Sequence, residues 1–199
     1  MKTDTRKKIL DTARALFNQY GYNSVSLRDI AKTVDISEGN LTYHFKKKEN
    51  LVESLLAEGE DTLPTGIPHT LKELDAIFLD QQQTIQKNLY FFLHYIQLSQ
   101  TSPEICQKQS ARYSELRRRF RVAFQNLHEI GLLRDEAFSG EYDNMIDMLH
   151  MSLIYWAPFM ELKKATHVES LEYRCYAWRS MYHLLTKDGL SELQSIIEI

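Results

Sequence analysis

Apolar side chains in the N-terminal part of the chain recur at the spacing of short amphipathic helices. Between Thr3 and Tyr20 they return every three or four positions, which predicts a helix with one buried face, capped by Thr3 or Thr5. Gly21 is expected to close this helix as its C-cap. A second helix of about two turns is expected over residues 27–34, because its apolar positions again share one face.

The second and third helices are each predicted to begin at a capping residue, with a tight turn between them. Ser26 can accept a hydrogen bond from the start of the second helix, and Asp29 stands where a capping-box acid would, as a weaker version of it. Asp35 tolerates left-handed backbone, and Ser37 offers a second N-cap. A third helix is therefore predicted to begin near Glu38, and the layout of the two helices is that of a DNA-reading helix-turn-helix.

The third helix presents short or planar polar groups once Leu41 and Phe45, four residues apart, face the core. Such groups suit a DNA groove, and the lysines at 46–48 put positive charge at the next helix start, where phosphates also favour free N–H groups. The residues predicted to contact DNA are Ser26, Ser37, Glu38, Gly39, Asn40, Thr42, Tyr43, His44, Lys47 and Lys48.

Helices followed by lysines also occur in proteins that do not bind DNA, so periodicity alone does not exclude a head with a purely structural role. The order of residues adds to the pattern: GYNSVSLRDIAKTVDISEGNLTYHFKKKENL resembles the N-terminal DNA-binding domain of the TetR family of bacterial transcriptional regulators. The matching features are the Gly-aromatic pair, RDIA, Ser-x-Gly-x-Leu, and His-Phe followed by Lys-Glu-x-Leu. The resemblance covers about the first quarter of the chain and is closest to a subgroup with GNLYYHF in its recognition helix.

The departures from that family pattern affect expected DNA contacts. Asp35 replaces the usual turn glycine, and Val25 replaces a frequent threonine, so that one phosphate contact of the family is expected to be missing. Thr42 stands where the subgroup has its first tyrosine, which is expected to change sequence preference. Lys47 replaces a capping Ser or Asn, which weakens a cap while keeping the charge.

The remainder of the chain is also predicted to be helical. A connecting helix is expected from Lys48 to about Leu63, before the breakers Pro64, Gly66 and Pro68. The domains are accordingly predicted as a DNA-binding head at 1–47, a connecting helix and linker at 48–66, and an effector-binding and dimerisation domain at 67–199. Further helices are expected at Thr70–Gln86, Asn88–Gln100, Pro103–Ile130, Ser139–Leu162, His167–Thr186 and Leu190–Ile197. Pro158 is expected to kink the helix Ser139–Leu162.

Aromatic and methionine residues in this second part are candidates for a ligand pocket, although the same residues make ordinary cores. The segment Leu89–Ile96 is apolar nearly all round, which predicts a helix buried in a bundle. The arginines at 117–121 are read as a solvated or salt-bridged face, with an anion clamp as the alternative. The candidate pocket residues are Tyr90, His94, Tyr113, Phe120, Phe124, Met148, Met151, Tyr155 and Trp156.

This second part resembles TetR-family effector domains more loosely, through the aromatic run Tyr90–Tyr95, the Gly131 turn and the Trp156 segment. The resemblance implies an all-helical domain that binds a small, often apolar molecule. It also implies a homodimer formed through the last two long helices, here Ser139–Leu162 and His167–Thr186. A dimer is expected on physical grounds too, because two recognition helices about 34–36 Å apart reach successive major grooves.

Charge and composition narrow the function. Residues 1–50 carry 10 Lys and Arg against 6 Asp and Glu, whereas residues 51–199 carry 14 against 21, which indicates a focused basic contact patch. The chain has neither a membrane-length apolar run nor a signal peptide, so a cytoplasmic protein without a membrane partner is expected. Cys106 and Cys175 are read as two packed thiols, with a redox pair as the alternative.

These observations predict an all-α protein with a helix-turn-helix head, a lever helix, and a ligand-binding and dimerisation bundle. The predicted function is a ligand-responsive transcriptional regulator, a repressor in preference to an activator, that binds a palindromic operator in double-stranded DNA as a homodimer. The chain shows no phosphate loop, metal spacing or nucleophile motif, so we expect no catalytic residues, no metal, no cofactor and no enzyme activity. The alternative is a helical protein-interaction adaptor whose head does not bind DNA.

Overall fold

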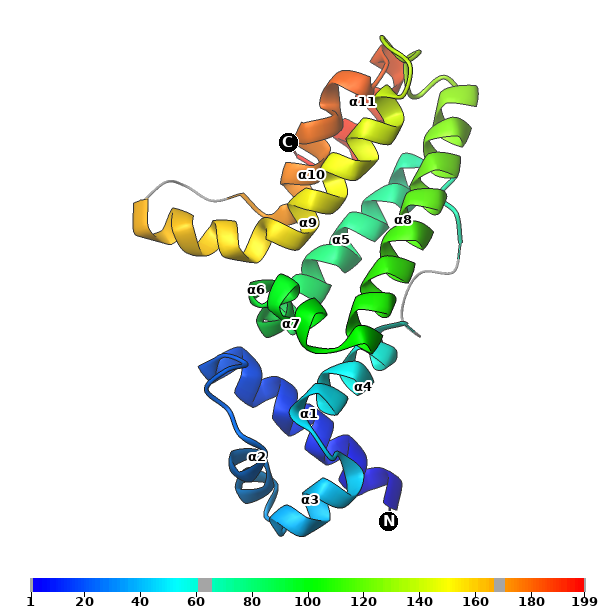
Figure 1. Cartoon of the computed structure of the whole chain (residues 1–199). Helices are drawn as coiled ribbons and strands as arrows, with labels where there is room; N and C mark the ends of the chain where they lie inside the picture. The colour runs from blue at the N-terminus through cyan, green and yellow to red at the C-terminus, as the bar shows by residue number, and fades with distance from the viewer. Residues whose placement is uncertain (1, 61–65, 167–170, 199) are drawn as a thin grey trace. The chain divides into compact units, whose positions relative to one another are not determined.

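The computed structural model describes residues 2–60, 66–166 and 171–198, and these residues form helices and no β-strand (Figure 1). An isolated antiparallel bridge joins Leu133 and Leu185. The all-α prediction is confirmed. The chain divides into two compact units, the first made of Met1–Leu63 with Asn88–Ser110 and the second of Pro64–Lys87 with Ala111–Ile199. The first unit contains residues from both sides of the predicted boundary at residue 66, because Asn88–Ser110 packs with the head.

The first four helices of the first unit follow the predicted head. They are α1 (Lys2–Tyr20), α2 (Leu27–Val34), α3 (Glu38–His44) and α4 (Lys48–Glu60); the predicted end of the connecting helix, at Leu63, lies outside the described residues. Helix α1 already begins at Lys2, so the predicted caps Thr3 and Thr5 lie inside it and that detail was wrong. The predicted C-cap is confirmed: Gly21 has φ +82°, and its N–H donates to Phe17 O at 2.9 Å.

The segment predicted as one helix over Asn88–Gln100 forms two helices, α6 (Leu89–Leu93) and α7 (Tyr95–Thr101). They separate at His94, whose φ of −116° and ψ of 19° leave the helical region. Because of this break, Leu93 is 37% and Ile96 50% exposed, so the prediction of burial all round was wrong. Apolar character extended along the whole segment, but each short helix has only one side available for packing.

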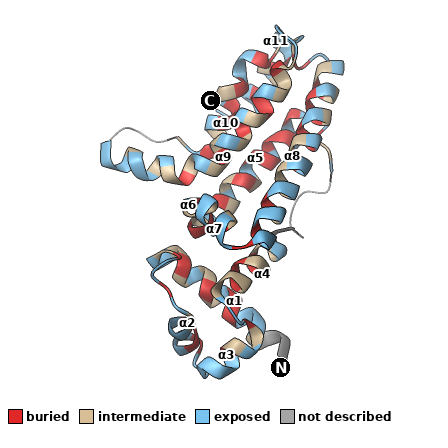
Figure 2. Ribbon diagram, in the orientation of Figure 1, coloured by how far each residue is buried: buried red, intermediate tan, exposed pale blue. Residues whose placement is uncertain are grey.

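In the second unit, helices pack around aromatic and aliphatic side chains. Its elements are α5 (Leu71–Lys87), the part of α8 (Pro103–Glu129) from Ala111 onward, α9 (Glu141–Thr166), α10 (Tyr173–Met181), the 3-10 turn η1 (Tyr182–Leu184) and α11 (Lys187–Ile196). Buried residues lie along one side of α5, α9 and α10 (Figure 2). Trp178 is fully buried there, and its Nε1–H donates to Asp75 Oδ1 at 2.9 Å.

Several predicted boundaries in the second unit shift. Helix α9 begins at Glu141, since Gly140 adopts φ +84° just before it, and it continues to Thr166. Figure 1 shows a change of direction in its C-terminal half, where Pro158 stands, so the predicted kink is confirmed. The last predicted helices end and begin differently: α10 stops at Met181, and α11 starts at Lys187 under a Thr186 cap. Residues 167–170 lie outside the described part.

One buried carboxylate holds the turn before α9. Both oxygens of Glu141 accept hydrogen bonds from the Arg134 guanidinium at 2.9 and 2.7 Å, and Oε2 also accepts from Ala137 N at 2.7 Å. The Arg134 bonds and the Ala137 amide lower the pKa of Glu141 from 4.5 to about 2. Glu141 is 7% exposed, so it joins the turn to the helix as a buried ion pair.

This pKa shift predicts a defined pH dependence. A depressed folded-state pKa adds stability that is present above the unfolded pKa of 4.5 and is lost as pH falls toward about 2. Glu141→Gln should therefore unfold at lower urea concentration than the parent at pH 7, and this difference should shrink between pH 4.5 and 2. Urea titrations across that range check the expectation. A difference that is constant with pH would contradict it, because the contribution would then not come from the ionised carboxylate.

Candidate nucleic-acid interface

The turn between α2 and α3 has the geometry that the two capping signals predicted. Asp29 N donates to Ser26 Oγ at 3.2 Å and Asp29 Oδ2 accepts from Ser26 N at 2.9 Å, so the capping box is complete rather than weak. The bonds from Ser26 lower the pKa of Asp29. Asp35 takes the left-handed conformation at φ 62°, and Ser37 Oγ accepts from Asn40 N at 3.1 Å. Local sequence signals therefore set both helix starts.

The inward faces of these helices form a small core. The side chains predicted to be buried on α2, on α3 and at the C-cap of α3 have at most 2% of their surface exposed, except Leu27, which is half-buried. The buried ones are Ile30, Ala31, Val34, Leu41 and Phe45. This burial fixes which side of α3 remains free. The free side is the one that the sequence assigned to the DNA groove.

Helix α3 is open to solvent along this side. Tyr43 is 73% exposed, and its ring lies at 5.4 Å from the His44 ring in an edge-on arrangement. A Cβ placed on Gly39 would meet nothing within 4 Å, so backbone there is accessible to a large partner. The Thr42 hydroxyl donates to Glu38 O at 3.0 Å, which leaves its methyl group and an oxygen lone pair for outside contacts.

The predicted DNA residues fall into three groups. Glu38, Gly39, Asn40, Thr42, Tyr43 and His44 share the short helix α3; Ser26 and Ser37 are exposed caps; Lys47 is exposed at the start of α4. Sequence reasoning did not single out Arg28 and Lys32, which are exposed on α2. Their spacing of four residues, which puts two basic groups on one side of a helix, was the available signal.

Lys48 has a different environment from the one expected. Its ammonium donates to Tyr22 O at 2.6 Å and to Val25 O at 3.0 Å, and lies 4.1 Å from the centre of the Tyr22 ring. Burial lowers the pKa of this lysine, and Glu49 partly opposes the shift. In place of the predicted free phosphate contact, the structure shows a link from α4 to the loop before α2. A role of Lys48 in DNA binding stays a prediction.

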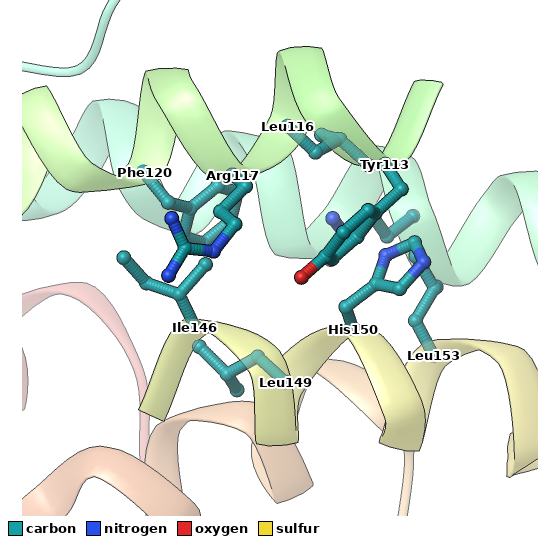
Figure 3. A pocket seen from close by; sticks show the side chains of 9 residues that line it. Tyr113, Leu116, Arg117, Phe120, Ile146, Leu149, His150 and Leu153 are labelled. Atoms are coloured by element: carbon teal, nitrogen blue, oxygen red, sulfur yellow. The ribbon is translucent and has the colours of Figure 1, made fainter. Parts of the chain in front are cut away.

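A small cavity of the second unit lies between α8 and α9 (Figure 3). Its volume is about 20 Å³, and its lining residues are Gln81 from α5, Tyr113, Leu116, Arg117 and Phe120 from α8, and Ile146, Leu149, His150 and Leu153 from α9. Two predicted pocket residues, Tyr113 and Phe120, are therefore brought together here. Arg117 was considered as an anion clamp and His150 as a possible polar group of a pocket, each as an alternative to a structural role. The other lining residues were missed, although the spacing 146, 149, 150, 153 is that of one helix face.

The other predicted pocket residues lie elsewhere. Met148, Met151 and Tyr155 are 47%, 55% and 54% exposed, because they project from a different side of α9 than the cavity residues. Trp156 lines a separate open groove next to Tyr173. Phe124 is fully buried in the core. Tyr90 and His94 belong to the first unit, so they do not line this cavity.

The described residues show neither a metal site nor a membrane-spanning helix, and their cysteines are not paired. No group of three His, Cys, Asp or Glu among them could hold a metal ion. None of the described helices is long and apolar enough to cross a membrane. Both cysteines are free; Cys175 is half-buried, but Cys106 is exposed, so its interpretation as a packed thiol was wrong.

Comparison with known proteins identifies the head. Residues 9–55 match the family model described as bacterial regulatory proteins, tetR family. The probable HTH-type transcriptional regulator YttP of Bacillus subtilis is 43% identical over 58 residues, which make up 29% of this chain and 28% of YttP. The match thus spans less than a third of that curated relative's length.

Longer matches extend beyond the head. The HTH-type transcriptional repressor KstR2 of Rhodococcus jostii is 28% identical over 151 residues, covering 71% of this chain and 72% of KstR2. The crystal structure of a TetR-family transcriptional regulator from Marinobacter aquaeolei VT8 has a TM-score of 0.79 at 21% identity, covering 97% of this chain and 98% of that chain. This likeness shows the fold.

The fold and the open α3 define a helix-turn-helix protein of the DNA-binding class. Within that class, residues 9–55 match the TetR family of bacterial regulatory proteins, and the chain has the fold of a TetR-family regulator. The expectation that it is not an enzyme agrees with these relatives, which are named as regulators of transcription.

The environment of Lys48 leads to a testable contrast with its neighbour. Lys48→Met should lower the free energy of unfolding by about 1–3 kcal/mol, because two carbonyl groups lose a charged donor. Lys47→Met should change it by less than about 0.5 kcal/mol, since Lys47 is exposed. Urea denaturation measures both. Equal stability of the two variants would contradict a structural role for the Lys48 ammonium.

Proposed function

We propose that this protein is a homodimeric, ligand-responsive repressor of transcription that binds a palindromic DNA operator. The observation that carries the proposal is the pair α2 and α3, joined by a tight turn, with α3 buried on one side and open on the other. One helix turned outward in this way can enter a major groove, while its partner helix lies across the phosphate backbone. The named regulators similar to the chain support the same function.

In this proposal, different residues of the head contact the bases and the phosphates. Asn40, Thr42 and Tyr43 on α3 contact base edges or thymine methyl groups, because amide, hydroxyl and aromatic groups can read them. Lys47 and the start of α4 hold a phosphate, with the helix N-terminus adding its own attraction for an anion. Arg28 and Lys32 on α2 supply further positive charge to the backbone.

Homodimerisation is supported by an apolar stripe on the second unit. Five large apolar side chains spaced three or four residues apart along α9 are between 47% and 69% exposed; they are Met148, Met151, Tyr155, Phe159 and Leu162. Tyr176 on α10 and Tyr182 in η1 are also exposed, at 36% and 44%. Contiguous exposed apolar surface of this kind marks an interaction site. A second copy of the chain is the proposed occupant, since two heads are needed for a palindrome.

Ligand response and repression rest on other observations. The cavity between α8 and α9 is the proposed effector site, and the similar protein KstR2 is named as a repressor. Effector binding would change the spacing of the two heads through α4, so that both half-sites can no longer be engaged together. By linkage, the effector must then bind less tightly when operator is present.

The first experiment is to select binding sites for the purified protein from fragments of its own genome. The best fragment is then titrated against salt and against random competitor DNA. A palindromic site bound by a dimer at least about 10³-fold more tightly than competitor would establish operator recognition. Binding without sequence preference would reject operator recognition, and the absence of DNA binding would favour the adaptor, which is indifferent to DNA.

Tyr43 provides a sharp test of the reading helix. Tyr43→Ala should weaken operator binding by about 10- to 100-fold without changing helix content, because the side chain is 73% exposed. Tyr20→Ala is the matched control, since Tyr20 is 57% exposed at the end of α1, away from α3 in sequence. Fluorescence anisotropy with labelled operator measures both. Equal affinities for the two variants would exclude α3 as the recognition helix.

Tyr155 tests the proposed dimer face. Tyr155→Glu places a charge in the apolar stripe, so the variant should sediment as a monomer at concentrations where the parent is a dimer. Phe138→Glu is the control, because Phe138 is 56% exposed but lies in the turn before α9. Sedimentation velocity separates the outcomes. A Tyr155→Glu protein that stays dimeric while Phe138→Glu dissociates would move the interface away from α9.

A further inference from the structure

The cavity between α8 and α9 contains two polar atoms that lack a hydrogen-bond partner. Gln81 Oε1 and His150 Nδ1 are both buried, and both residues line this cavity. Gln81 is 7% exposed and projects from α5, whereas His150 comes from α9 (Figure 3). Buried polar groups are normally bonded, so an unpartnered pair facing one cavity points to a missing polar group.

The remaining polar groups around the cavity already have partners. Tyr113 OH donates to Asp147 Oδ1 at 2.8 Å. Arg117 Nε donates to the same oxygen at 3.2 Å, and its Nη2 lies 3.3 Å from Asp143 Oδ2. Arg117 therefore faces two carboxylates, and its charge is not left over to attract an anion. The other lining residues are aliphatic or aromatic, so an ionic ligand would lose its hydration without compensation.

The chemistry of the two free atoms restricts the missing group further. Burial, together with the nearby charge of Arg112, lowers the pKa of His150, which favours the neutral ring at pH 7 despite the opposing effect of Asp147. An amide oxygen can only accept a hydrogen bond, whereas a ring nitrogen accepts or donates according to its tautomer. A ketone or ether cannot donate to Gln81. A neutral hydroxyl group offers both functions, because its hydrogen can be donated to Gln81 Oε1 and its oxygen can accept from Nδ1–H of His150.

We propose that this cavity is a hydroxyl-binding subsite and that the effector is a neutral, largely apolar molecule with one hydroxyl group beside Gln81 and His150. This inference rests on the proposed ligand response and adds the chemical class of the ligand. The hydrocarbon part of the molecule packs against Leu116, Ile146 and Leu153. An alcohol or a phenol satisfies both requirements.

The volume of the cavity determines how such a molecule enters. About 20 Å³ accommodates one hydroxyl-sized group, so the hydrocarbon part requires α8 and α9 to separate. The polar bonds that cross between these helices run from Tyr113 and Arg117 to Asp147, whose side chain is 41% exposed, and from Arg117 and Arg121 to Asp143, whose side chain is 26% exposed. Ion pairs that water can reach contribute little to stability. Opening the helices here therefore costs mainly apolar packing, which the hydrocarbon part of the ligand replaces while the hydroxyl group stays bonded to the buried pair.

The test compares two probes that differ only in the polar group, 4-propylphenol and 4-propyltoluene. Isothermal titration of the full-length protein should show the phenol binding at least about tenfold more tightly, because the methyl group leaves both polar atoms unpartnered. In Gln81→Met, which keeps side-chain length, this preference should fall to about twofold or less. Gln83→Met is the matched control, since Gln83 is exposed on the same helix, and it should keep the full preference.

A second variant distinguishes loss of the hydroxyl contact from misfolding of the Gln81 variant. His150→Leu should reduce the same preference, and melting temperatures of all variants are measured without probe. Equal affinity of the two probes for the parent protein, failure of the phenol to bind, or an undiminished preference in Gln81→Met would each overturn the subsite.

Operator binding is measured separately, so that the two proposals fail independently. A phenol preference that depends on Gln81, without any effect of the phenol on operator affinity, would retain the subsite and reject its role in regulation. Release of operator by apolar compounds lacking a hydroxyl group, with no phenol preference, would retain ligand response and overturn the subsite.

Discussion

The geometry of the head depends on the hydrogen bonds that the ammonium group of Lys48 donates. It bonds to the carbonyls of Tyr22 and Val25 and lies against the Tyr22 ring, so one cation joins the start of α4 to the loop before α2. That loop begins at the Gly21 cap and ends at the Ser26 capping box. Its conformation decides the direction of α2 and therefore the side of α3 that faces solvent. A lysine here orients α3 whether or not it also contacts a phosphate.

Buried carboxylates have the same organising role in the second unit. Asp75 accepts two bonds from Arg174, at 2.7 and 2.6 Å, and one from the Trp178 ring nitrogen. Glu141 holds the Arg134 turn against α9. Each carboxylate has its partners on an element distant in sequence or across a turn, so each specifies one arrangement of the packed helices. The cavity beside Gln81 differs, because two of its polar atoms, Gln81 Oε1 and His150 Nδ1, lack such partners.

Much of the head was predictable because its determinants are local. The caps at Ser26 and Ser37, the left-handed Asp35 and the buried Leu41 and Phe45 follow from neighbours within four residues, and the structure bears them out. The ligand-pocket residues were predicted less well. Met148, Met151 and Tyr155 have the composition of a pocket, but only packing against α5 and α8 decides which side of α9 is buried. The operator contacts and the dimer remain predictions.

The sequence by itself determined most of the helices, the helix-turn-helix and the resemblance of the head to the TetR family, since each depends on periodicity, capping residues and a short ordered motif. Only the tertiary structure decided that α6 and α7 pack with the head, that Lys48 bonds to backbone, and that Gln81 and His150 share a cavity. The reason is physical. Local signals act over one or two helical turns, whereas these three features join residues 23 to 74 positions apart, whose meeting depends on the packing of whole helices.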